Sequence, residues 1–165
     1  MDLVSLEAPV RALGEALRAR GWRLATAESC TGGLIAAACT AVAGSSDWFD
    51  RGVVSYSNAA KSELLGVDPA LIAAHGAVSE PVALAMAAGV RRLASAQLSV
   101  AVTGIAGPGG AVPGKPVGTV WIAWDVLGGA PRAQVFHFDG DRAAVRAQAV
   151  VEALRGLRAR AEDGR

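Results

Sequence analysis

The sequence predicts a three-layer α/β domain with a mixed sheet. Segments with apolar residues at helical spacing alternate with short apolar runs in the first hundred residues, which favours helices interleaved with strands. Near the C-terminus, the turn-forming residues 128–131 join two strand-like runs, as in a β-hairpin, so antiparallel pairs are also expected. With 165 residues, the chain is expected to be one domain over residues 1–165, with its core at about 4–160.

Helix boundaries are marked by capping and stop residues. Apolar residues recur at helical spacing from Leu6 to Leu17, and Gly21 follows as a stop signal. Ser57 or Asn58 is a candidate N-cap, and a proline follows another cap at Asp68. The predicted helices cover residues 4–20, 34–42, 57–65, 68–75, 79–94 and 141–160, with a frayed tail at 161–165.

Short apolar runs predict the strands. They cover residues 22–27, 52–56, 98–102, 117–127 and 132–138. Residues 103–116 contain five glycines and three prolines, which predicts a loop after the third strand.

Composition excludes several classes of function. The formal net charge is +1 and the charges are scattered, whereas nucleic-acid binders show a basic patch. No apolar run is long enough to span a membrane and the N-terminus lacks signal-peptide features, so we expect a cytoplasmic protein. Two cysteines, Cys30 and Cys39, argue against disulfide and zinc frameworks, and neither metal nor cofactor is expected. Trp48 and Phe49 stand beside polar residues, which suggests an apolar contact and a homodimer.

The segment 28–33, Glu-Ser-Cys-Thr-Gly-Gly, forms a small polar turn between a predicted strand and a predicted helix. Ser29 there is either an N-cap or a nucleophile beside the unpaired N–H groups of the helix, which would stabilise an oxyanion. Cys30 has the same two alternatives, a small core residue or a thiol activated by the helix N-terminus.

Only Lys61 and Lys115 are lysines among the 16 Lys and Arg residues. Lys61 lies near the start of a short helix, where it is either solvated or held partly neutral as a general base. Tyr56, the only tyrosine, ends the preceding strand and is either a half-buried aromatic or a hydroxyl in the same hydrogen-bond network. Lys115 lies between two prolines and is expected to contact ligand or solvent.

Two further segments suggest ligand binding. Thr103 is at a predicted strand end, the edge where open α/β sheets bind ligands, and the glycine-rich loop after it does not have the spacing of a dinucleotide fingerprint. Arg142 and Arg146 lie one turn apart at the start of the last helix, which suits either a bound phosphate or a solvated pair.

Together these motifs resemble one family, the CinA C-terminal domain family, over about residues 6–157. The motifs that carry the resemblance are Glu28-Ser29-Cys30-Thr31-Gly32-Gly33, Ala43-Gly44-Ser45-Ser46, Val54-Ser55-Tyr56-Ser57-Asn58-Ala59-Ala60-Lys61, His75-Gly76-Ala77-Val78-Ser79-Glu80, Thr103-Gly104-Ile105-Ala106-Gly107-Pro108 and Gly140-Asp141-Arg142. Stand-alone members of this family are nicotinamide mononucleotide deamidases.

The resemblance implies hydrolysis of the carboxamide of nicotinamide mononucleotide, without metal or cofactor. It implies Ser29 as nucleophile, Lys61 as base and Tyr56 as an assisting hydroxyl. The expected substrate-binding residues are Thr31, Gly32, Gly33, Asn58, Thr103, Gly104, Gly107 and Arg142. Two alternatives remain: a nucleotide-binding module without catalysis, and a cysteine amidase that uses Cys30.

Overall fold

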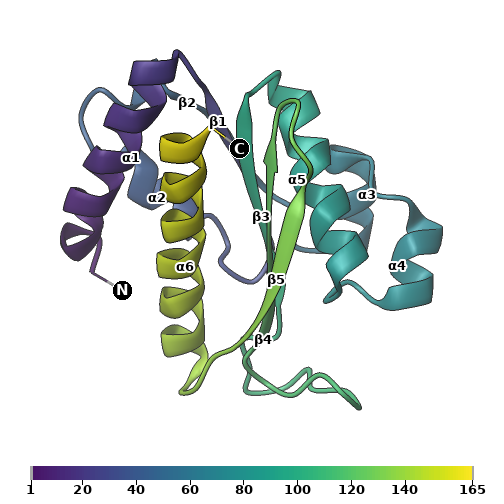
Figure 1. Ribbon diagram of the computed structural model, residues 1–165. Coiled ribbons are helices and arrows are strands. Elements are labelled where there is room, and N and C mark those ends of the chain that lie inside the picture. Colours follow the sequence, from purple (N-terminus) through teal and green to yellow (C-terminus); the bar gives the residue numbers. More distant parts are fainter. Residues whose placement is uncertain (1, 165) are drawn as a thin grey trace.

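Two layers of helices enclose a five-stranded mixed sheet in the computed structural model, which describes residues 2–164 (Figure 1). The strands lie in the order β2-β1-β3-β4-β5. β1 pairs in parallel with β2 and β3, whereas β3–β4 and β4–β5 are antiparallel. The predicted α/β class with a mixed sheet is therefore confirmed.

The elements follow the predicted order closely. The strands are β1 (Leu24–Glu28), β2 (Phe49–Val54), β3 (Leu98–Gly104), β4 (Thr119–Val126) and β5 (Arg132–His137). The α-helices are α1 (Glu7–Arg20), α2 (Leu34–Thr40), α3 (Asn58–Leu65), α4 (Pro69–His75), α5 (Glu80–Ala94) and α6 (Arg142–Asp163). Two short 3-10 helices, η1 (Val4–Leu6) and η2 (Ser45–Asp47), precede α1 and β2.

The helices divide between the two faces of the sheet. α1, α2 and α6 cover one face, and α5 covers the other with α3 and α4 outside it (Figure 1). α3 approaches α5 very closely, since a Cβ built on Gly89 would lie 2.1 Å from the carbonyl oxygen of Leu65. Only glycine fits there, so Gly89 sets how near the helix that carries Lys61 comes to α5.

The carboxyl ends of β1, β2 and β3 meet at one edge of the sheet, because these three strands are parallel. Every residue of β1 is buried, and so is nearly all of β3, which explains why both read as continuous apolar runs. Chain segments that leave these strands therefore begin close together, which is the usual place for a ligand site in an open α/β sheet.

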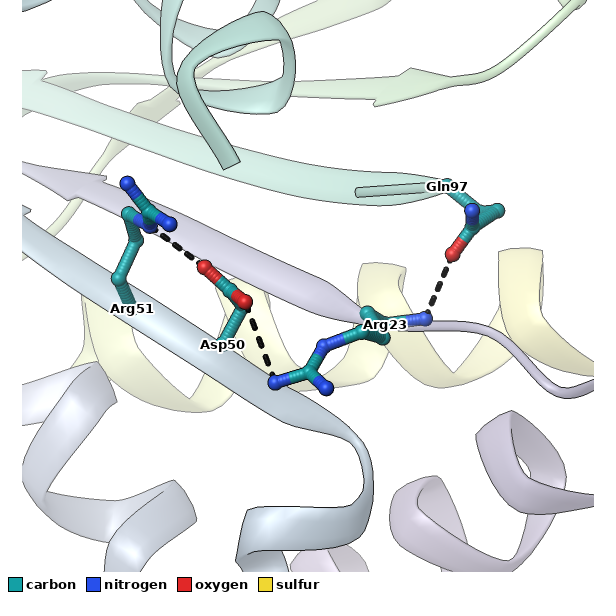
Figure 2. Close-up of polar contacts among 4 residues, drawn as sticks. All are labelled: Arg23, Asp50, Arg51 and Gln97. Atoms are coloured by element: carbon teal, nitrogen blue, oxygen red, sulfur yellow. Dashed lines mark hydrogen bonds and ion pairs between the residues drawn. The ribbon is translucent and has the colours of Figure 1, made fainter. Parts of the chain in front are cut away.

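The opposite ends of the same strands are joined by side chains (Figure 2). The side-chain oxygen of Gln97, just before β3, accepts the backbone N–H of Arg23 at 2.8 Å, just before β1. The guanidinium of Arg23 pairs with the carboxylate of Asp50 in β2 at 3.1 Å, and Arg51 pairs with the same carboxylate. These contacts fix the relative register of the three strands whose far ends carry the site.

Two predictions about particular residues are wrong. Thr103 and Gly104 do not open a loop, because β3 continues through them and pairs them with Trp121 and Val120 of β4. Trp48 is only 1% exposed and belongs to the core, where its indole lies against Gly14 of α1. The apolar surface on which the homodimer was suggested is therefore absent at this residue.

Within residues 2–164, no helix is long and apolar enough to cross a membrane. The same residues contain no group of three or more His, Cys, Asp and Glu side chains arranged to hold a metal ion.

Candidate active site

A cavity of about 210 Å³ opens at the carboxyl ends of β1, β2 and β3. It contains seven of the residues to which the resemblance assigned a catalytic or substrate-binding role: Ser29, Tyr56, Asn58, Lys61, Thr103, Gly104 and Arg142. Cys30, Ala77, Val78 and Ala106 complete its lining. The tertiary structure thus brings together residues from segments separated by more than one hundred positions.

Ser29 and Lys61 are in direct contact in this cavity. The Nζ of Lys61 lies 3.1 Å from the Oγ of Ser29. Lys61 also donates to the carbonyl oxygens of Ser55 at 2.9 Å and Tyr56 at 3.2 Å. The lysine is only 1% exposed, so it is not the solvated side chain that was one of its two expected alternatives.

The surroundings of Lys61 favour its neutral form. Burial lowers the pKa of the ammonium group, and no salt bridge among the described residues includes it. A neutral amine has two hydrogens and one lone pair. A neutral Lys61 would donate its two hydrogens to the two carbonyl oxygens, because a carbonyl oxygen only accepts. Its lone pair would then accept a hydrogen bond from the hydroxyl of Ser29, because a hydroxyl also donates.

The turn after β1 is held by the carboxylate of Glu28, which is 1% exposed. Its Oε2 accepts the N–H groups of Gly33 at 3.1 Å and Ile35 at 3.0 Å, and its Oε1 accepts that of Ala36 at 2.9 Å. These N–H groups at the start of α2 were the expected oxyanion donors. That expectation is wrong, because a carboxylate of the protein itself already occupies them.

Two backbone donors of the turn stay free. The N–H of Gly32 donates to the carbonyl oxygen of Ser29, and the N–H of Ser29 donates to the carbonyl oxygen of Val102. Within residues 2–164, the N–H groups of Cys30 and Thr31 form no such bond. They directly follow Ser29 and are therefore the donors nearest along the chain to its hydroxyl.

Cys30 is unsuited to act as the nucleophile. Its side chain is 5% exposed, and burial raises the pKa of the thiol to about 11. A thiol with this pKa is protonated near neutral pH, whereas the thiolate is the reactive form. The amine of Lys61 is also hydrogen-bonded to the hydroxyl of Ser29 and not to the thiol of Cys30.

Tyr56 meets Lys61 through its carbonyl oxygen and not through its hydroxyl. Tyr56 is 60% exposed, and its hydroxyl oxygen accepts a hydrogen bond from Nη2 of Arg142 at 3.0 Å. Nη1 of Arg142 donates to the carbonyl of Gly107 at 2.9 Å. The tyrosine is not a half-buried core residue, and its hydroxyl is bonded to Arg142 and not to the lysine amine.

Four predicted substrate-binding residues do not line the cavity: Thr31, Gly32, Gly33 and Gly107. Thr31 is fully buried, so its side chain does not reach the cavity. Gly33 donates to Glu28, and Gly107 serves as an acceptor for Arg142. The hydroxyl of Thr103 lines the cavity but donates to the carbonyl of Ala77 at 2.9 Å.

Lys115, which was expected to contact ligand or solvent, makes one contact that the sequence did not indicate. Its Nζ donates to the carbonyl oxygen of His75 at 2.8 Å, which ties the loop after β3 to the end of α4. The contribution of Ser55, Ala77 and Val78 was missed, because their backbone atoms and apolar surfaces carry no chemical signal in a sequence. The only indication in the sequence was that they lie within the motifs at residues 54–61 and 75–80.

A second cavity of about 670 Å³ adjoins the first. The two share Ala106 and Arg142, and the second reaches the first turns of α6 at Gly140, Asp141, Ala143 and Arg146. At that start, the carboxylate of Asp141 caps the N–H of Ala144. Arg142 therefore stands between a small cavity that holds the serine–lysine pair and a larger one beside a helix N-terminus.

Comparisons with known proteins show which family the chain belongs to. The family model for the CinA C-terminal domain matches residues 7–161. A protein of Enterobacter agglomerans named nicotinamide-nucleotide amidohydrolase PncC is 55% identical over 142 residues, which cover 86% of this chain and 87% of the relative. A protein of the same name from Escherichia coli K12 is 51% identical over 145 residues, 88% of each chain.

A solved structure has the same fold. The crystal structure of a competence-damaged protein (CinA) superfamily protein from Klebsiella pneumoniae superimposes with a TM-score of 0.90 at 43% identity, covering 98% of each chain. Family model, relatives and structure agree over nearly the whole chain. The chain therefore belongs to the CinA C-terminal domain family.

Proposed function

We propose that the protein hydrolyses the carboxamide of nicotinamide mononucleotide to give nicotinic acid mononucleotide and ammonia. The observation that carries this proposal is the buried contact between Lys61 and Ser29 in a cavity at the carboxyl edge of the sheet. The names of the relatives, which are nicotinamide-nucleotide amidohydrolases, supply the substrate.

In the first step, Ser29 Oγ attacks the carboxamide carbon while neutral Lys61 accepts its proton. The C–O bond to the enzyme forms and the carbonyl oxygen becomes an oxyanion. Lys61 then gives the proton to the amide nitrogen, the C–N bond breaks, and ammonia leaves. An acyl-enzyme on Ser29 remains, and Lys61 is again neutral.

In the second step, water cleaves the acyl-enzyme. Lys61 accepts a proton from the water, and the hydroxide attacks the acyl carbon. The bond to Ser29 Oγ breaks as the proton returns to that oxygen, which releases the carboxylic acid. Both steps pass through an oxyanion, for which the free N–H groups of Cys30 and Thr31 are the proposed donors.

The phosphate of the substrate is expected to bind beside Arg142. The guanidinium lies on the wall shared by the two cavities, and α6 begins there with Arg142 and Ala143, whose N–H groups precede the one that Asp141 caps. The small cavity would then hold the pyridine ring with its carboxamide toward Ser29, and the larger cavity the ribose and phosphate. With both cavities filled, a nucleotide would make more contacts than free nicotinamide, which would fill only the small cavity.

Ammonia release tests the proposal. Purified protein is incubated with nicotinamide mononucleotide, nicotinamide riboside, nicotinamide and nicotinamide adenine dinucleotide, and ammonia and the acid product are measured. We expect turnover to be most efficient with the mononucleotide. Binding of the mononucleotide without turnover would contradict the proposal and would favour a nucleotide-binding module.

A further inference from the structure

Arg146 of α6 holds the backbone of the turn that follows Ser29. Its Nε donates to the carbonyl oxygen of Cys30 at 3.0 Å, and its Nη2 donates to that of Thr31 at 3.1 Å. The two contacts join segments that are more than one hundred residues apart. Arg146 is therefore not a member of the solvated pair that was one of the two alternatives for Arg142 and Arg146.

We propose that Arg146 is a positioning residue that orients the oxyanion-binding peptide groups after Ser29. This inference rests on the proposed role of Ser29 as nucleophile. In a planar trans peptide the C=O and the following N–H point in opposite directions. Fixing the carbonyl of Cys30 therefore fixes the direction of the Thr31 N–H, which is one of the two free donors.

The turn is held from both ends by opposite charges. The carboxylate of Glu28 accepts N–H groups at its α2 end, and the guanidinium of Arg146 donates to two of its carbonyls. Gly32 permits the conformation of the turn, because its φ is +61°, a backbone conformation that residues with side chains rarely adopt. A positively charged donor on the Cys30 carbonyl also polarises the same peptide group, which strengthens the Thr31 N–H as a donor.

Arg146 and Arg142 thus have separate tasks. Both arginines line the larger cavity, and each donates through two nitrogens. Arg146 donates only to carbonyls of the turn after Ser29, whereas Arg142 donates to the carbonyl of Gly107 and to the hydroxyl of Tyr56 at the wall of the small cavity. Loss of a residue that binds the phosphate of the substrate should raise KM. Loss of a positioning residue should lower kcat, because the ground state does not yet carry the oxyanion charge.

The first measurement is the kinetics of Arg146→Ala and Arg146→Lys. Because a misplaced oxyanion donor costs on the order of 100-fold in rate, we expect kcat to fall by about that factor while KM changes little. Lysine should not restore the rate, since one ammonium does not bridge two carbonyls in the same geometry. Guanidinium added to Arg146→Ala should restore kcat saturably. Arg155→Ala, an exposed position on the same helix, is the matched control and should behave as wild type.

The second measurement does not depend on the substrate. An alkyl fluorophosphonate should label Ser29: the Oγ–P bond forms, fluoride leaves, and Lys61 takes the proton. The phosphoryl oxygen occupies the oxyanion position, so the labelling rate reports the orientation of the donors. We expect Arg146→Ala to be labelled much more slowly than wild type and Arg155→Ala, with Ser29→Ala unlabelled. Thermal melting shows that each variant is folded.

The outcomes separate the two proposals. If wild type is labelled at Ser29 and Arg146→Ala is labelled slowly, but no ammonia is released from nicotinamide mononucleotide, the substrate is wrong and the role of Arg146 stands. Equal labelling rates for folded Arg146→Ala and wild type would overturn that role. An effect on KM alone, or no labelling of wild type, would overturn it as well.

Discussion

The Nζ of Lys61 lies 3.1 Å from the Oγ of Ser29, although the two residues belong to α3 and to the turn after β1. Both side chains are buried, and the lysine is otherwise bonded only to two backbone carbonyls. A buried lysine without a carboxylate partner is poorly stabilised as a cation. The pair therefore has the two features that a serine nucleophile with an amine base requires: contact and a lowered amine pKa.

Replacement of the nucleophile should abolish turnover. We expect Ser29→Ala to lose at least about three orders of magnitude in kcat, because no acyl-enzyme forms without the hydroxyl. Substrate binding, measured by calorimetry, should survive, since the phosphate contacts are elsewhere. Cys30→Ala is the neighbouring control and should retain most of the activity. The reverse pattern, an active Ser29→Ala and an inactive Cys30→Ala, would show a cysteine amidase.

Lys61→Arg should be nearly as damaging as Lys61→Ala. Arginine keeps the charge and much of the length, but it does not accept a proton at a workable pH. In wild type, kcat should rise with pH as Lys61 loses its proton, and this acidic limb should begin below the usual pKa range of lysine. A Lys61→Arg enzyme with substantial activity and the same acidic limb would mean that the base is another group.

The lowered pKa of Lys61 should also be visible in stability. The folded state disfavours the ammonium form, so between the lowered and the ordinary pKa the unfolded state binds more protons. The free energy of unfolding should therefore increase with pH across that interval, and it should remain at its reduced level below it. Urea unfolding of wild type and Lys61→Met over this pH range measures the effect. The variant should lack the dependence.

Arg142→Ala should weaken substrate binding more than the chemical step. Loss of a charge-assisted contact with phosphate raises KM, and about 2 kcal/mol of lost binding corresponds to roughly 30-fold. The comparison with nicotinamide riboside is decisive, because a substrate without phosphate should be much less sensitive to the change. An equal loss with both substrates would show that Arg142 acts on the chemistry, through Tyr56 or the turn, rather than on the phosphate.

Glu28→Gln should destabilise the fold as well as slow the reaction. The carboxylate accepts three N–H groups while almost fully buried, and an amide nitrogen in place of one oxygen would face donors. We expect a loss of about 2 to 4 kcal/mol in the free energy of unfolding, measured with urea. Glu7→Gln removes an exposed ion pair with Arg11 and should cost less than about 1 kcal/mol. Similar losses in the two variants would contradict the role assigned to Glu28.

Much of the secondary structure follows from local sequence. Ser57 caps α3 and Asp68 caps α4 through their side chains, as predicted, because a capping residue and the N–H that it accepts are at most three positions apart. Apolar runs likewise indicated all five strands, with boundaries displaced by up to three residues at β2. The continuation of β3 through Gly104 was not predictable, since it depends on pairing with a strand that comes later in the chain.

The sequence by itself determined the α/β class, the order of the elements and the segments that line the cavity, because spacing, caps and motifs are properties of neighbouring residues. The tertiary structure decided which atoms meet. In the folded chain Lys61 contacts Ser29, and Glu28 accepts the N–H groups at the start of α2. Trp48 is buried in the core. Each of these contacts depends on burial and on hydrogen-bond geometry, and most join segments distant in the chain. Local sequence patterns do not contain that information.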